Sequence, residues 1–168
     1  MKDYTYIAAD FDHDKGAVDC LYWMRRNGYI YFKDAHDIQQ SNDDSLACSI
    51  KKSLRNRLDQ SYKFILIVGD HTDTVTKGGC QLCGSYNSHT YSCGRGYTVD
   101  YRSFIKFECD KAVADNLKIV VLYNSGSVDR SLCPEAVRWK GTHQKMWYRG
   151  TDGKNYWDYN GIANAIDG

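Results

Sequence analysis

Two long apolar runs constrain the fold more than any other feature of this sequence. They read "KFILIVGD" over Lys63–Asp70 and "LKIVVLYN" over Leu117–Asn124, and neither alternates regularly between apolar and polar residues. A strand with one face in water shows such an alternation, whereas a strand that is covered on both faces does not. We therefore predict that both runs are buried strands of a parallel sheet.

The rest of the chain alternates between strand-like and helix-like patterns. Further strands are expected at Tyr4–Ala9, Tyr29–Phe32 and Lys145–Arg149. Helices are expected at Ala17–Asn27, Leu46–Leu58 and Asp100–Asp115, with a last helix capped by Asp158. This order of elements predicts a single α/β domain over residues 1–168, with an open parallel sheet and helices on both of its faces.

Charge and hydropathy exclude several classes of partner. The chain has 22 basic and 21 acidic side chains, so no overall field would attract nucleic acid or an anionic membrane. No run approaches the ~20 apolar residues of a membrane helix, and the first residues lack the apolar core of a secretion signal. We expect a cytoplasmic protein without a membrane partner, and the charge balance does not favour a nucleic-acid partner.

A ligand site is expected where the strands end. Open parallel sheets bind ligands at the carboxyl ends of their strands. Here this rim comprises Asp10–Asp14, Lys33–Asp43 and Gly69–Thr98. The first of these, "DFDHD", offers carboxylates that could hold ribose hydroxyls or a metal, and a histidine that could act as a general acid. The same residues could equally be turn and N-cap residues of the following helix.

Glu108, in "FIKFECDKAV", is the most unusual acidic residue. It lies one helical turn after Phe104 and is surrounded by apolar positions. A carboxylate on such a face is costly unless it is exposed, paired or used in function. The residues alone favour pairing with Lys106 or Lys111 on the same helix over a functional role.

The segment over residues 77–98 is rich in cysteine and glycine. Its spacing, Cys80-x2-Cys83-x5-His89-x3-Cys93, supplies four ligands of the type that binds tetrahedral zinc. Four protein ligands would leave no open position, so such a zinc ion would be structural. Free thiols and a disulfide remain open as alternatives.

Three stretches, taken in order, carry a resemblance. They are "SIKKSLRNRLDQSYKFILIVGDHT", "FIKFECDKAVADNLKIVVLYN" and "DGKNYWDYNGIANAID". Together they resemble the TIR-like proteins of the Thoeris antiphage defence system (the ThsB type). With the first strand and the "DHD" turn, the resemblance covers most of the chain outside the cysteine segment. The end of the first strand, "IAADFD", departs from the family pattern, which usually has a serine followed by aromatic and histidine residues.

This resemblance implies a flavodoxin-like, three-layer fold with five parallel strands in the order 2-1-3-4-5, in which the cysteine segment is an insertion after the third strand. It implies cleavage of the N-glycosidic bond of NAD, the substrate, to give a nucleotide signal that switches on an effector. It also implies a homo-oligomer or a larger TIR assembly. Carried over residue by residue, Glu108 would be the catalytic glutamate, and Phe104 would occupy the aromatic position of the motif. Asp10, Phe11, Asp12 and Asp34 would line the nucleotide pocket.

Three other functions remain open at this point. The chain could be a TIR-like scaffold that recruits partners without catalysis. It could be an enzyme similar to nucleoside deoxyribosyltransferases, in which a glutamate attacks a ribose. It could also be a zinc-knuckle protein that binds single-stranded nucleic acid, although the cysteine segment carries few basic residues.

Overall fold

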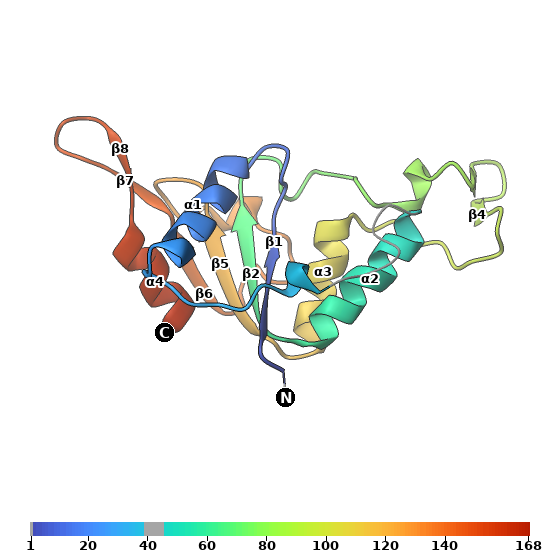
Figure 1. Ribbon diagram of the computed structural model, residues 1–168. Coiled ribbons are helices and arrows are strands. Elements are labelled where there is room, and N and C mark those ends of the chain that lie inside the picture. The colour runs from blue at the N-terminus through green and yellow to red at the C-terminus, as the bar shows by residue number, and fades with distance from the viewer. Residues whose placement is uncertain (1, 39–45) are drawn as a thin grey trace.

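A four-stranded parallel sheet forms the centre of the computed structural model, which describes residues 2–38 and 46–168 (Figure 1). Its strands are β1 (Tyr4–Ala8), β2 (Ser61–Val68), β5 (Lys118–Tyr123) and β6 (Thr142–Lys145), and they lie in the order β1-β2-β5-β6. All three pairings are parallel. The two apolar runs of the sequence are thus the two central strands, as predicted.

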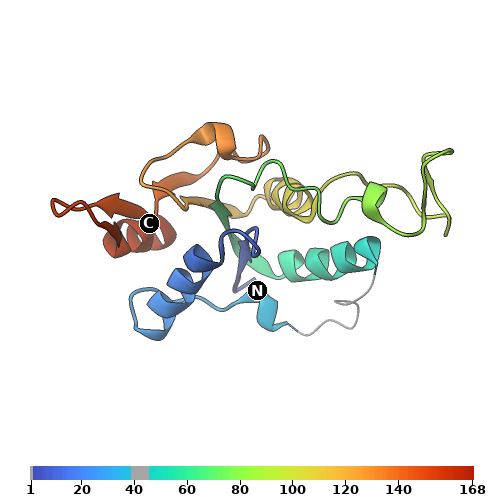
Figure 2. The same ribbon diagram turned by 90° about the horizontal axis from the view of Figure 1, so that it is seen from above.

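Four helices cover the two faces of this sheet. Helices α1 (Lys15–Arg26) and α4 (Tyr159–Asp167) pack on one face, and α2 (Ala47–Asp59) and α3 (Phe104–Ala114) on the other (Figures 1 and 2). The residues just before α3 and α4 cap these helices, because the Ser103 hydroxyl and the Asp158 carboxylate accept backbone N–H groups of the first turn. The predicted α/β layers are confirmed.

Strand β2 shows why the central runs lack alternation. Phe64, Leu66 and Val68 belong to the core beneath α2 and α3, while Ile65 and Ile67 belong to the core beneath α1 and α4. Successive side chains of a strand point to opposite faces, so both sets must be apolar when both faces are covered.

The predicted second strand, Tyr29–Phe32, is not formed, so the expected five-stranded sheet is wrong in this strand, while the other four lie in the expected order. This segment contributes only an isolated bridge between Thr5 and Asp34, where Thr5 N–H donates to the carbonyl of Lys33 at 2.7 Å. Ile30 and Phe32 are buried. Their side chains anchor the segment against the core without a hydrogen-bonded ladder, and the chain then turns into the short helix η1 (Ala35–Asp37).

The predicted strand Lys145–Arg149 is also corrected. The sheet ends with β6, and the aromatic residues after it form a separate antiparallel hairpin of β7 (Trp147–Arg149) and β8 (Asn155–Trp157). This hairpin projects away from the sheet (Figure 1). Met146, which lies between β6 and β7, is buried in the core and anchors the base of this hairpin.

The cysteine segment lies between β2 and α3 and extends beyond the end of α2 (Figure 1). It contains only the short helix η2 (Cys80–Leu82) and the two-residue strands β3 (Tyr86–Asn87) and β4 (Ser92–Cys93). Another short helix, η3 (Arg130–Leu132), lies between β5 and β6. Among the described helices, none has the length and apolar character to cross a membrane.

Candidate functional site

A cavity of about 210 Å³ lies beside the carboxyl end of β1, on the face of the sheet that α2 and α3 cover. Its walls come from segments far apart in the sequence: Tyr6, Ala9, Asp10, Phe11, Asp12, His13, His36, Ile50, Leu54, Val75, Lys77, Phe104, Ile105 and Glu108. We call this cavity the Glu108 pocket. It brings together five of the six residues expected at a nucleotide site, namely Asp10, Phe11, Asp12, Phe104 and Glu108.

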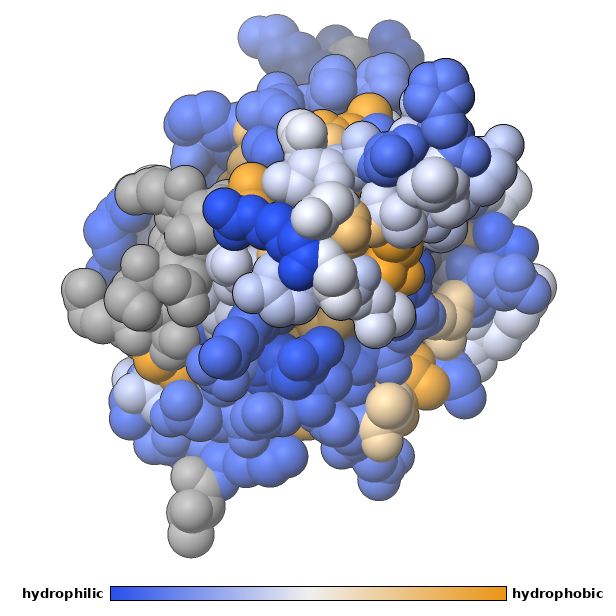
Figure 3. Space-filling model, turned by 90° about the vertical axis from the view of Figure 1, so that its right-hand side faces the viewer, coloured by the Kyte–Doolittle hydropathy of each residue, from blue (hydrophilic) through white to orange (hydrophobic). Residues whose placement is uncertain are grey.

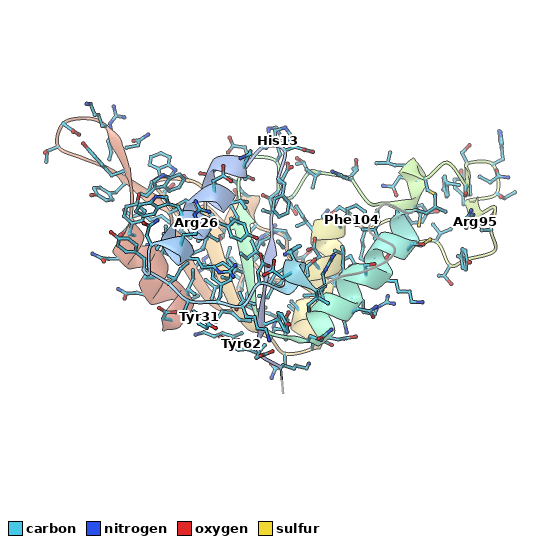
Figure 4. The ribbon with its side chains drawn as sticks, in the orientation of Figure 1. His13, Arg26, Tyr31, Tyr62, Arg95 and Phe104 are labelled. Carbon is cyan, nitrogen blue, oxygen red and sulfur yellow. The ribbon has the colours of Figure 1, made fainter. Side chains whose placement is uncertain are left out.

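Figure 4 shows how the pocket relates to the rest of the molecule. His13 lies above the sheet at the turn after β1, and Phe104 lies at the beginning of α3. Arg95 lies at the far end of the cysteine segment, away from both. Apart from Lys77, the first residue of the cysteine segment, the residues that line the pocket belong to the body of the fold. Residues 39–43 of the expected rim lie outside the described residues.

Glu108 is buried in the pocket wall, with only 6% of its surface exposed. This burial raises the pKa of its carboxyl group to about 7, although the neighbouring Tyr6 hydroxyl and the charge of His36 oppose the shift. Lys111, a predicted partner, instead pairs with Asp59 and Asp115, each at 2.7 Å. In the described parts of the chain Glu108 has no ion-pair partner, so the pairing that the sequence favoured is not formed.

Tyr6 adds a polar group that the sequence did not reveal. It is fully buried, and burial together with the charge of Glu108 raises the pKa of its phenol well above the usual value. The group is therefore a neutral O–H at any ordinary pH. Its hydroxyl group lies near enough to Glu108 for each to shift the pKa of the other, but among the described residues it meets no partner with hydrogen-bond geometry. Buried polar groups are nearly always hydrogen-bonded, so this hydroxyl is available to a ligand in the pocket.

The acidic turn after β1 forms a backbone turn, as the sequence allowed, but the side chain of Asp14 does not cap α1. The backbone carbonyl of Asp10 accepts N–H groups of His13 and Asp14, which makes the turn. Asp10 Oδ2 lies 2.6 Å from Nδ1 of His13, whose ring stacks on His71 at a centroid distance of 4.0 Å. The side chains from Asp10 to His13 nevertheless line the pocket.

Asp14 belongs to the frame of the sheet and not to the pocket. It is buried and accepts a hydrogen bond at 3.0 Å from the side chain of Asn124, just after β5. Burial raises the pKa of its carboxyl group. A Cβ added at Gly69 would overlap this carboxylate, so only glycine allows β2 to end beside it.

Asp34 does not line the Glu108 pocket but holds a residue that does. Its buried carboxylate accepts hydrogen bonds from the Tyr22 hydroxyl at 2.5 Å and from the backbone N–H of His36 at 2.9 Å. Burial alone would raise its pKa, but the His36 and Tyr22 hydrogen bonds lower it. Asp34 and His36 also line a neighbouring cavity of about 590 Å³, together with Arg25 and Arg26 of α1.

The predicted zinc ligands are distributed differently from the expectation. Cys80, Cys83 and Cys93 line a small second cavity, whereas His89 does not. None of the seven cysteines forms a disulfide. Among residues 2–38 and 46–168, no three His, Cys, Asp or Glu side chains are gathered into a group that could hold a metal ion. The pKa of the Cys93 thiol is lowered, chiefly by hydrogen bonds from the backbone N–H groups of Arg95 and Tyr97.

Comparison with known proteins gives no family for this chain. No protein-family model matches it, and no curated protein matches it at a significant level. The function of the Glu108 pocket therefore has to be inferred from the side chains that line it.

Proposed function

We propose that this chain is a TIR-like enzyme that cleaves the N-glycosidic bond of NAD in the Glu108 pocket. The product would be an ADP-ribose-type nucleotide that acts as a signal in bacterial antiphage defence, in the cytoplasm. The observation that carries the proposal is a buried, unpaired carboxylate in a pocket that also contains Asp10, Asp12 and Phe104. Isolated buried acids with shifted pKa values are concentrated at functional sites.

Cleavage of the N-glycosidic bond requires a group that stabilises positive charge, and a carboxylate is such a group. The bond between C1′ of the ribose and the pyridinium nitrogen breaks, and its electron pair leaves with nicotinamide, which becomes neutral. Positive charge then develops on the ribose, and an ionised Glu108 would stabilise this charge in a site with little water. Attack on C1′ by water, with loss of a proton to solvent, gives hydrolysis. Attack by another nucleophilic group of the same ligand gives a cyclic product.

The protonation state of Glu108 fits this role. With a pKa of about 7, a substantial fraction of the carboxyl groups is ionised at neutral pH. The positive charge of the nicotinamide ring and then of the ribose favours the ionised form further, because an opposite charge nearby lowers the pKa of an acid. The neutral Tyr6 hydroxyl can donate to the carboxylate or to a ribose oxygen.

The size of the pocket suggests how a dinucleotide would divide between two cavities. A volume of about 210 Å³ is below the ~300–1,000 Å³ of typical small-molecule sites, so it suits the nicotinamide ribose half. The neighbouring cavity shares His36 and presents Arg25 and Arg26. Guanidinium groups bind phosphate oxygens well, so the pyrophosphate would lie there.

The direct test is incubation of concentrated protein with NAD while nicotinamide release is followed by chromatography. TIR domains act in assemblies, so we propose a homo-oligomer and expect activity to rise steeply with protein concentration. Glu108→Gln should lower the rate by at least about 10²-fold, as loss of one charge-stabilising group typically does. The matched control is Glu135→Gln, which alters the chain's other glutamate at an exposed position. Full activity in Glu108→Gln would remove the catalytic assignment.

A second candidate is an enzyme similar to nucleoside deoxyribosyltransferases. The small volume of the Glu108 pocket favours it, since a nucleoside is smaller than NAD. In that case Glu108 would attack C1′ as the N-glycosidic bond breaks, and the departing base would take up a proton. A second base would then displace Glu108 from the covalent glycosyl-enzyme, with no requirement for NAD. Mass spectrometry of the protein after incubation with a deoxynucleoside distinguishes the two. Absence of either turnover in the assembled protein would leave the non-catalytic scaffold.

A further inference from the structure

The cysteine segment has almost no buried residues and little regular secondary structure to hold it in place. Of residues 77–98 only Gly79 is buried, and the segment's regular structure is limited to η2, β3 and β4. Figure 3 views the molecule from this side and shows apolar residues in small, separate groups among hydrophilic ones. A segment that cannot bury an apolar core is normally held by disulfides or by a metal ion. Its cysteines form no disulfide.

Four thiols line one small cavity beside this segment. Three are Cys80, Cys83 and Cys93 of the segment, and the fourth is Cys48 in the first turn of α2. The cavity is about 20 Å³, which is enough for a single water-sized occupant. His89 is exposed in the turn between β3 and β4 and contributes nothing to this wall.

Backbone N–H groups already point at the sulfur atoms of the segment. Asp100 N–H donates to Sγ of Cys80 at 3.2 Å, and Ser85 N–H donates to Sγ of Cys83 at 3.5 Å. Such hydrogen bonds stabilise negative charge on sulfur and orient it, which is how groups around a metal site support thiolate ligands.

We propose that Cys48, Cys80, Cys83 and Cys93 bind one Zn²⁺ as a tetrathiolate site that ties the insertion to α2. Cys48 takes the place that the sequence spacing had assigned to His89. Each thiol gives up its proton on binding, so four protons are released and the centre carries two negative charges. Arg95, which also lines the cavity, lies where it can offset part of that charge.

The sulfur atoms have to move together for this site to form, because they are not gathered as a coordination group among the described residues. Two glycines beside the cysteines have the backbone freedom that this movement requires. Gly84 and Gly94 directly follow Cys83 and Cys93, and a Cβ added at Gly84 would meet nothing within 4 Å. A closed four-ligand shell leaves no site for water or substrate, so the ion is structural and separate from the Glu108 pocket.

The test uses the full chain, reduced and freed of metal with a chelator, and titrated with Co²⁺ as a spectroscopic replacement for zinc. We expect one ion per chain, with tetrahedral d–d bands and strong sulfur-to-cobalt absorption that Zn²⁺ abolishes. Cys48→Ser should remove about a quarter of the sulfur-to-cobalt absorption, since three thiolates replace four. It should weaken binding by more than tenfold, because altering groups that merely support the ligands already costs about 10–100-fold.

His89→Ala is the matched control and should leave both the spectrum and the affinity unchanged. Zn²⁺ should also protect residues 77–98 from proteolysis in the parent chain and in His89→Ala, but much less in Cys48→Ser. Absence of stoichiometric cobalt binding would overturn the proposal. Loss of binding in His89→Ala together with full binding in Cys48→Ser would overturn it as well, in favour of three thiolates and an imidazole.

Discussion

Glu108 is held in an environment that costs free energy. An ionised carboxyl group without a partner is unfavourable in a buried site, and the raised pKa of about 7 is the measure of that cost. No ion pair offsets it in the described residues, and the adjacent Tyr6 hydroxyl also lacks a hydrogen bond. A buried carboxylate without an ion pair, beside a buried hydroxyl without a hydrogen-bond partner, is typical of a site organised for a ligand instead of for stability.

Glu108→Gln is therefore expected to stabilise the protein at alkaline pH. In the native chain Glu108 keeps its proton up to about pH 7, whereas in the unfolded chain it loses the proton near its ordinary pKa of 4.5. The unfolded state thus binds fewer protons in this window, and the stability of the parent protein falls as pH rises through it. At pH 8 the variant should be more stable by up to about 3 kcal/mol, at about 1.4 kcal/mol for each pKa unit. At pH 4 this advantage should vanish.

Urea unfolding at pH 4, 6 and 8 measures this difference. Glu135→Gln, at an exposed position, should change the free energy of unfolding by less than about 0.5 kcal/mol at every pH. A Glu108→Gln variant that is equally destabilised at pH 4 and pH 8 would contradict the view that burial of a charge dominates at this position.

The same titration sets the pH dependence of the proposed reaction. Only the ionised form of Glu108 can stabilise positive charge on the ribose, so kcat/KM for NAD should rise from pH 6 to pH 8 with an apparent pKa of about 7 in the free enzyme. Initial rates of nicotinamide release in a series of buffers at constant ionic strength provide the measurement. A flat profile over this range would argue that the rate does not depend on this carboxylate.

Among the elements, strands that are buried on both faces could be predicted from the sequence. Whether a segment forms hydrogen bonds with a neighbouring strand could not. The central strands β2 and β5 leave a direct signature, because both of their faces must be apolar. The segment Tyr29–Phe32 has the composition of a strand, yet buried Ile30 and Phe32 anchor it without a ladder. The pattern of apolar residues indicates which side chains are buried, but it does not indicate which backbone N–H and C=O groups form hydrogen bonds with a neighbouring strand.

The site was predictable to a similar degree. Asp10 and Asp12, which follow β1, could be assigned to the rim from the order of strands and helices. Glu108, within α3, was assigned to the pocket only by the resemblance, because the residues alone favoured an ion pair. Tyr6 could not be distinguished from a core tyrosine, because its role depends on a missing hydrogen bond. Cys48 could not be connected with the cysteine segment, because only the tertiary fold brings the first turn of α2 beside it.

Gly78 lies near the start of the cysteine segment, against Phe104 at the first position of α3, and offers a test of this contact. It has a positive φ of 96°, and a Cβ added there would lie 2.5 Å from the ring of Phe104. Gly78→Ala should therefore destabilise the protein by about 1–3 kcal/mol, as expected for a residue forced into a sparsely populated conformation. It should also lower nicotinamide release, because Phe104 lines the Glu108 pocket.

The control for this change is Gly16→Ala. A Cβ at Gly16, in the first turn of α1, would meet nothing within 4 Å, so this variant should be neutral or more stable by up to about 1 kcal/mol. Urea unfolding and the rate of nicotinamide release are measured on both variants. Equal behaviour of the two would show that Gly78 is not constrained by its neighbour.

At the scale of the whole molecule, the insertion joins the body of the fold through a narrow base. Cys80 N–H donates to the carbonyl of Asp100 at 2.8 Å, and Phe104 N–H donates to the carbonyl of Lys77 at 2.9 Å, so the two ends of the segment lie side by side. The buried Lys51 of α2 fixes this base through an ion pair with Asp100 at 3.3 Å. Although burial opposes it, pairing with Arg102 and Lys51 lowers the pKa of Asp100 to about 2.

This arrangement predicts that the insertion can be removed without loss of the fold. Replacing residues 81–99 by a short glycine turn keeps Cys80, Asp100 and the hydrogen bond between them. The variant should unfold cooperatively, within about 1 kcal/mol of the metal-free parent chain, because the deleted residues contribute no buried side chain and a shorter loop is cheap to close. The variant should lose metal binding. It should retain nicotinamide release within about threefold, because Lys77 and Phe104, the residues of the Glu108 pocket nearest to the deletion, remain. Urea unfolding, cobalt titration and the NAD assay on one preparation measure the stability, the metal binding and the turnover of the variant. Loss of cooperative unfolding or of turnover would mean that the insertion supports the pocket although it supplies few of the residues that line it.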